Sequence, residues 1–155
     1  MVDFKKWTLA VVAVGLMLFC GSCSDSTLNQ IAKFEADLNA ACSTTFTIVA
    51  GASATSPPLI STSDAATIIS TLVTIEQGNR QAQTATAQIS TLSAANQASL
   101  LNVLMPIQTA INNSVANGTL GIKDAATKQK VQLALVSIQT IVNAGIALIQ
   151  AAKTA

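Results

Sequence analysis

The chain has 155 residues and a formal net charge of +1 at pH 7, with 10% charged and 50% hydrophobic residues. This length suits a single domain. A near-neutral chain lacks the basic surface that nucleic-acid binding requires, so we expect no nucleic-acid partner. Histidine is absent, which excludes imidazole metal ligands and Ser-His or Cys-His catalytic pairs.

The beginning of the chain has the three parts of a secretory signal sequence. Lys5 and Lys6 precede an uncharged run over residues 7–19, and two small residues follow at positions 21 and 22. A positive start, an apolar middle and a small-residue processing site are typical of exported proteins. The run is shorter than the roughly 20 residues of a membrane span, but its extension to Cys23 leaves an uncleaved N-terminal anchor as the alternative.

Two cysteines close this segment in the motif CGSC, residues 20–23. The motif resembles the lipobox of bacterial lipoproteins, in which small residues precede the cysteine that receives the lipid. Cys20 stands where leucine is usual, and Cys23 takes the lipidated position. The resemblance implies a signal peptide over residues 1–22 and acyl chains, such as palmitate, that hold residues 23–155 on a membrane.

The residue after the predicted lipidation site indicates which membrane receives the protein. In Gram-negative lipoproteins, an Asp directly after the lipidated cysteine favours retention in the inner membrane. Ser24 occupies that position here, and Asp25 comes one residue later. The resemblance therefore implies a membrane-anchored protein of the bacterial cell envelope, on the outer membrane if the organism is Gram-negative.

The cysteine spacing also suits a redox or metal-binding CxxC pair, which is the competing interpretation. A metal site needs further Cys or His ligands, and the remaining chain offers only Cys42. We therefore expect no metal and no cofactor. Cys42 is either a small buried hydrophobic residue or a thiol that bridges to another chain, and its place on an apolar helix stripe favours burial.

Four later segments have the periodicity of amphipathic helices, at residues 26–50, 64–92, 94–117 and 124–152. Each begins near a Ser, Asp or Asn that can cap its first turn. The longest connection, residues 51–63, contains two adjacent prolines that cannot continue a helix. The pattern predicts an all-α fold, an antiparallel four-helix bundle preceded by an N-terminal apolar signal or anchor helix.

The first of these segments has one apolar stripe along its length. Lys33, Glu35 and Asp37 are expected to lie mostly off that stripe. The stripe residues follow at steps of three and four: Leu28, Ile31, Phe34, Leu38, Cys42, Thr45 and Val49.

The second and third segments contain residues that weaken or interrupt their helices. Gly78 costs roughly 1 kcal/mol relative to Ala in a helix interior. Asn79, Ala82 and Thr86 are small or polar residues on the apolar face, so packing there is expected to be close or weak. Pro106 is expected to kink or break the third helix.

The last segment is uncharged from Val131 to Ala152 and has one narrow polar stripe. The stripe is a possible interaction surface that consists of Gln132, Gln139, Asn143 and Gln150. One interpretation is the central helix of a bundle with a thin solvent-facing strip. The other is a helix that enters a membrane or an oligomer, with the amides bonding across helices.

No motif in the chain supports catalysis. The carboxylates are scattered, and the glycine motifs that bind phosphate are absent. We expect a non-catalytic, lipid-anchored envelope protein with a structural or protein-interaction role, whose partners are the membrane and either an envelope protein or further copies of the chain. The alternatives are a membrane-active or oligomer-forming protein that uses the last helix, and a carrier of a small apolar ligand.

Overall fold

The computed structural model describes residues 26–119 and 121–152, and these residues form four α-helices and no strand. The helices are α2 (Thr27–Ser53), α3 (Thr62–Ala87), α4 (Ala94–Asn117) and α5 (Ala125–Ala151). The predicted all-helical class is confirmed for this part of the chain. The predicted N-terminal signal or anchor helix lies outside the described residues.

A side-chain cap starts every helix. The residues at the cap position, Ser26, Ser61, Ser93 and Asp124, each accept a hydrogen bond from the backbone N–H three residues later, over distances of 3.3, 3.1, 3.3 and 2.7 Å. These bonds satisfy N–H groups that lack a partner within the helix. Local sequence thus determines where the helices begin, although Ser61 rather than Ser63 or Asp64 caps α3.

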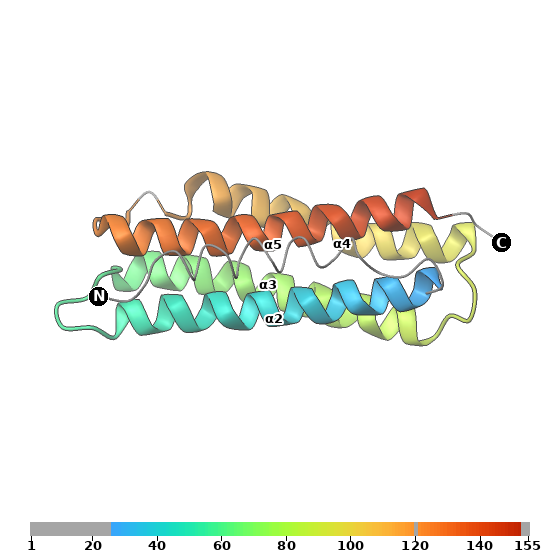
Figure 1. Cartoon of the computed structure of the whole chain (residues 1–155), viewed down its shortest axis with the longest axis horizontal. Coiled ribbons are helices and arrows are strands. Elements are labelled where there is room, and N and C mark those ends of the chain that lie inside the picture. Colours follow the sequence, from blue (N-terminus) through green and yellow to red (C-terminus); the bar gives the residue numbers. More distant parts are fainter. Residues whose placement is uncertain (1–25, 120, 153–155) are drawn as a thin grey trace.

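The helices form a bundle in which each packs on two others. α2 contacts α3 and α5, and α4 also contacts α3 and α5, whereas the diagonal pairs make no contact. Figure 1 shows the four helices side by side along the long axis, with the α2–α3 and α4–α5 connections at one end and the α3–α4 connection at the other. The core is therefore a narrow aliphatic column between four helices, with Phe34 as its one buried aromatic side chain among the described residues.

α3 is shorter than the periodicity predicted. It ends at Ala87 rather than near residue 92, because the backbone N–H of Gln88 bonds to the carbonyl of Ala85 and that of Ile89 bonds to the carbonyl of Thr86. Bonds across three residues tighten the last turn and close the helix. Leu92 still enters the core, but it does so from the connection and covers the end of the bundle.

Pro106 does not break α4, which continues from Ala94 to Asn117. The proline lies on the exposed side of the helix. Its missing N–H leaves the carbonyl of Asn102 without a helical partner, and water can bond that carbonyl on an exposed face. The solvent-facing position therefore explains why the helix tolerates this residue.

Gly78 has a low helix propensity, but it lies where α3 and α4 approach each other. A Cβ atom at this position would lie 2.6 Å from Cδ1 and 2.8 Å from Cγ1 of Ile107. The cost in helix propensity is thus offset by close packing of the two helices. The need for glycine at position 78 therefore depends on the neighbouring helix α4.

Nine threonine hydroxyls of the described residues are bonded within their own helices. Each of these donates to the carbonyl oxygen four residues earlier, which satisfies a side chain that would otherwise compete for the backbone. The residues that make this bond are Thr44, Thr45, Thr47, Thr67, Thr71, Thr74, Thr84, Thr109 and Thr140. A chain rich in threonine can therefore form long helices.

Candidate functional site

The interface between α2 and α3 contains a buried polar cluster. Glu35 from α2 is 3% exposed and Asn79 from α3 is 1% exposed. Asn79 Nδ2 donates to the backbone oxygen of Glu35 over 2.8 Å, and the hydroxyl of Thr86 donates to Glu35 Oε1 over 2.7 Å. We call Glu35, Asn79 and Thr86 the polar cluster; it joins residues that are far apart in the sequence.

One acceptor of the polar cluster has no partner. Asn79 Oδ1 is buried and receives no hydrogen bond from the described residues. A buried polar atom without a partner typically costs about 1–3 kcal/mol. The cluster is therefore a point of weakness in an otherwise apolar core.

Burial also shifts the pKa of a carboxyl group at this interface. It raises the pKa of Glu35 above its ordinary value of 4.5, and the hydrogen bond from Thr86 opposes that effect by favouring the ionised carboxylate. Asp37, two residues further along α2, also has a pKa raised by burial. The carboxyl group of the polar cluster can thus bind a proton more readily than an exposed one.

The sequence-based placement of Glu35 off the apolar stripe was wrong. Ile31, Glu35, Leu38 and Cys42 follow at steps of four, three and four residues, so they share one helix face. That spacing could have indicated burial, but a carboxyl group is seldom buried without a partner. The partners, Asn79 and Thr86, come from another helix and cannot be identified by spacing within α2.

Cys42 is free and fully buried in the described structure. Burial, together with the nearby negative charge of Glu76, raises the pKa of its thiol from 9.0 to about 12. The buried-hydrophobe interpretation of Cys42 is therefore confirmed over an exposed bridging thiol.

We expect Cys42 to react very slowly with a thiol reagent in the folded protein. A pKa of about 12 instead of 9.0 leaves roughly three orders of magnitude less thiolate at pH 8. Measuring the labelling rate with and without denaturant tests this expectation. Rapid labelling of the peptide that contains Cys42 in the folded chain, distinguished by mass from labelling at Cys20 or Cys23, would contradict the burial of Cys42.

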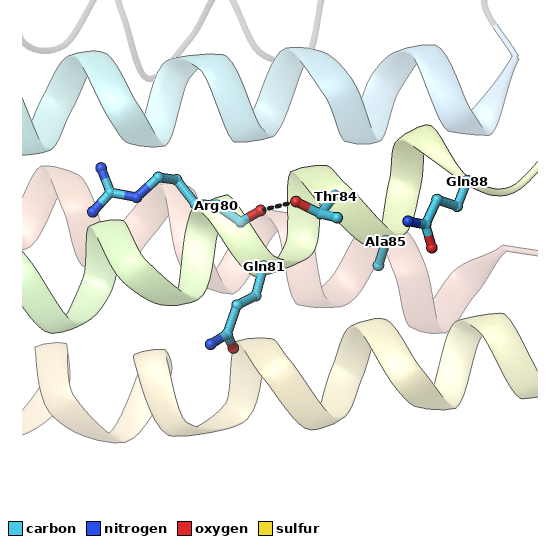
Figure 2. Close-up of a pocket in the computed structure, with 5 residues that line it drawn as sticks. All are labelled: Arg80, Gln81, Thr84, Ala85 and Gln88. Carbon is cyan, nitrogen blue, oxygen red and sulfur yellow. Dashed lines mark hydrogen bonds between the residues drawn. The ribbon is translucent and has the colours of Figure 1, made fainter.

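A shallow depression lies on the outer side of α3, with a volume of about 370 Å³. Figure 2 shows its lining, in which the side chains of Arg80, Gln81 and Gln88 point in different directions. The Thr84 hydroxyl is already bonded to the backbone oxygen of Arg80 at 2.9 Å. Because these polar groups do not converge, the depression lacks the features of a specific ligand site.

The predicted interaction stripe on α5 lies along its outward side, next to α4. Gln139 Nε2 donates to Asn112 Oδ1, and Gln108 Nε2 donates to Asn143 Oδ1, both over 2.8 Å. Gln132 and Gln150 are exposed. Two of the four stripe residues are thus engaged with α4 of the same chain, and the structure does not bring the stripe near the polar cluster.

α5 is the helix of the described part that is long and apolar enough to cross a membrane by length and composition. The core helix of a bundle has the same properties. Its apolar residues, such as Val131, Leu135 and Ile138, are buried within the bundle. Leu133 and Val136 remain 37% and 38% exposed on its outer side.

The remaining predicted site, Cys23, lies outside the described residues. Within residues 26–119 and 121–152, no group of three or more Cys, Asp or Glu side chains is placed to hold a metal ion. Comparison of the chain with protein-family models, with curated proteins and with solved structures finds no match.

Proposed function

We propose that this protein is a non-catalytic lipoprotein of the bacterial cell envelope, anchored through an acylated Cys23 and acting in envelope structure or protein interaction. The observation that carries the proposal is the position of the CGSC motif directly before a rigid domain. Cys23 precedes the cap residue of α2, Ser26, by only three positions. An anchor at Cys23 would thus attach the membrane to the start of a helix. Ser24 favours the outer membrane in a Gram-negative organism.

The domain that this anchor would hold is, in our proposal, an antiparallel four-helix bundle. Its connections lie at alternate ends, so that each helix returns along the previous one (Figure 1). Short connections between long helices favour this arrangement. Such a bundle offers a stiff body and long outer faces, which suit a structural or interaction role.

The decisive experiment is the mass of the N-terminal peptide from protein isolated with its native membranes. A peptide that begins at an acylated Cys23 supports the proposal, whereas one that retains Met1 refutes it in favour of an uncleaved anchor. Cys23→Ala should release the domain from the membrane or leave it unprocessed. Cys20→Leu is the matched control, because it restores the usual lipobox residue and should leave acylation intact.

The second candidate is a membrane-active or oligomer-forming protein that uses α5. The exposed side chains of Leu133 and Val136 favour it, whereas the burial of most apolar residues of α5 favours the bundle core.

We expect Gln139→Lys and Asn143→Lys together to cost only about 1–2 kcal/mol of unfolding free energy, because each removes one exposed hydrogen bond. Chemical denaturation measures this cost, and membrane fractionation and size-exclusion chromatography measure membrane association and assembly. Unchanged membrane association and assembly would remove the candidate based on α5, whereas loss of either would favour it over a solvent-facing stripe.

The ligand-carrier alternative depended on small residues that were expected to leave a space between helices. Ala82 is buried at that position, and Thr86 is bonded to the carboxyl group of Glu35. Protein side chains occupy the interface where the ligand was expected. No observation therefore favours the carrier over the two functions above.

A further inference from the structure

The charged residues of the bundle are unevenly distributed along its axis. One end consists of the start of α2, the α3–α4 connection and the end of α5, which lie together in Figure 1. The residues that form it, 26–32, 86–99 and 145–152, include no charged side chain. The nearest charged residues in the sequence are Asp25, Lys33 and Lys153, which directly adjoin these ranges. We call this the uncharged end.

The opposite end, formed by the α2–α3 and α4–α5 connections, is charged. It carries Asp64, Lys123, Asp124, Lys128 and Lys130 near the starts of α3 and α5. We call it the charged end. Charged groups resist the loss of hydration. The charged end should therefore approach a lipid surface at a higher free-energy cost than the uncharged end.

The short segment between Cys23 and the start of α2 decides which end lies near the membrane. Three peptide steps separate Cys23 from Ser26, and an extended chain spans at most about 3.6 Å for each. An acylated Cys23 would lie at the lipid surface, so the start of α2 must stay within roughly 11 Å of that surface. The start of α2 belongs to the uncharged end.

The long sides of the bundle offer no competing membrane face. Large exposed apolar side chains are spread over all four helices instead of gathering on one of them. On the helices they are Phe46 on α2, Val73 on α3, Met105 on α4, and Leu133 and Val136 on α5. Leu59, the other large exposed apolar residue of the described chain, lies in the α2–α3 connection. A helix that lies flat on a membrane needs its apolar residues on one side.

We propose that the bundle stands on the membrane, with its uncharged end against the lipid surface and its charged end directed away from it. This inference rests on the proposed acylation of Cys23. α2 has 27 residues, and at 1.5 Å per residue the charged end would be held roughly 40 Å from the bilayer.

Energy transfer to a lipid-surface dye tests this orientation. The sample is the mature acylated protein, residues 23–155, in phosphatidylcholine vesicles that contain a headgroup-labelled acceptor lipid. One donor dye is attached through Ser90→Cys at the uncharged end, and the other through Ala126→Cys at the charged end; both positions are exposed. Cys42 is buried and its thiol pKa is raised to about 12, so it should not be labelled.

Several-fold stronger transfer from position 90 than from position 126 is expected. Equal transfer would overturn the upright orientation in favour of a bundle that lies on its side, and stronger transfer from position 126 would reverse it. Peptide mass and vesicle co-sedimentation are measured on the same samples. Protein without acyl chains would overturn the proposed function and the orientation together, whereas acylated protein with equal transfer would overturn the orientation alone.

Discussion

Gly145→Ala is expected to lower the free energy of unfolding by about 1–3 kcal/mol, the usual cost of overpacking a core. A Cβ atom at position 145 would lie 2.6 Å from Cδ2 and Cζ of Phe34, whose ring packs against the backbone of α5. Phe34 is itself buried, and a rigid ring among packed neighbours has little room to move. This clash should exceed the gain of about 1 kcal/mol in helix propensity.

Gly51→Ala is the matched control for this prediction. Position 51 also lies inside a helix, α2, but a Cβ atom there would meet nothing within 4 Å. The same substitution should therefore stabilise the protein by roughly 0.5–1 kcal/mol. Chemical denaturation followed by circular dichroism measures both variants, and equal effects of the same sign would contradict the role assigned to Phe34.

A second substitution separates the clash from other effects of Gly145→Ala. Phe34→Leu replaces the ring with a smaller side chain and should by itself destabilise the core. In that background the added methyl group has more space, so Gly145→Ala should cost less than it does in the natural chain. A double-mutant cycle over these two positions measures the difference, and strict additivity would exclude direct contact as the cause.

Glu35→Gln is expected to raise the stability of the protein at neutral pH and to flatten its dependence on pH. Because the pKa of Glu35 is raised in the folded state, the folded protein binds a proton more tightly than the unfolded chain does. Stability should therefore fall as the pH rises from the ordinary value of 4.5 to the raised pKa, and it should level off above that. Glutamine keeps an oxygen that can accept from Thr86 and has no charge to bury.

Denaturation of the natural chain and the variant between pH 4 and pH 8 tests this prediction. Asp37→Asn is measured alongside, because Asp37 also has a pKa raised by burial and contributes a slope of the same sign. A variant that is less stable than the natural chain at every pH, with the slope unchanged, would show that Glu35 is not the group that titrates.

Thr86→Val tests the contact that favours the ionised form of Glu35. The substitution removes the hydroxyl donor and nearly preserves the volume, so it should raise the pKa of Glu35 further and cost roughly 1.5–3 kcal/mol when Glu35 is ionised. Combined with Glu35→Gln, the same change should cost less. Equal costs in the two backgrounds would mean that the bond to the carboxylate is unimportant for stability.

Much of the fold could be predicted from local features of the sequence. The stripe through Ile31, Leu38 and Val49 and the caps Ser26, Ser93 and Asp124 depend only on residues within one or two helical turns. The all-helical class follows from them. The interpretation of CGSC as a lipidation motif is likewise a local inference, and it remains a prediction because Cys23 lies outside the described residues.

Contacts between residues of different helices could be seen only in the tertiary structure. Glu35 is buried because Asn79 and Thr86 lie opposite it on α3, and Gly145 is required because the ring of Phe34 packs there. The pairing of Gln139 with Asn112 depends in the same way on the alignment of α5 with α4. Periodicity identifies which residues of one helix share a face. It does not show which residues of another helix pack against that face. The hydrogen bonds and close contacts between helices therefore became visible only when the helices were placed together.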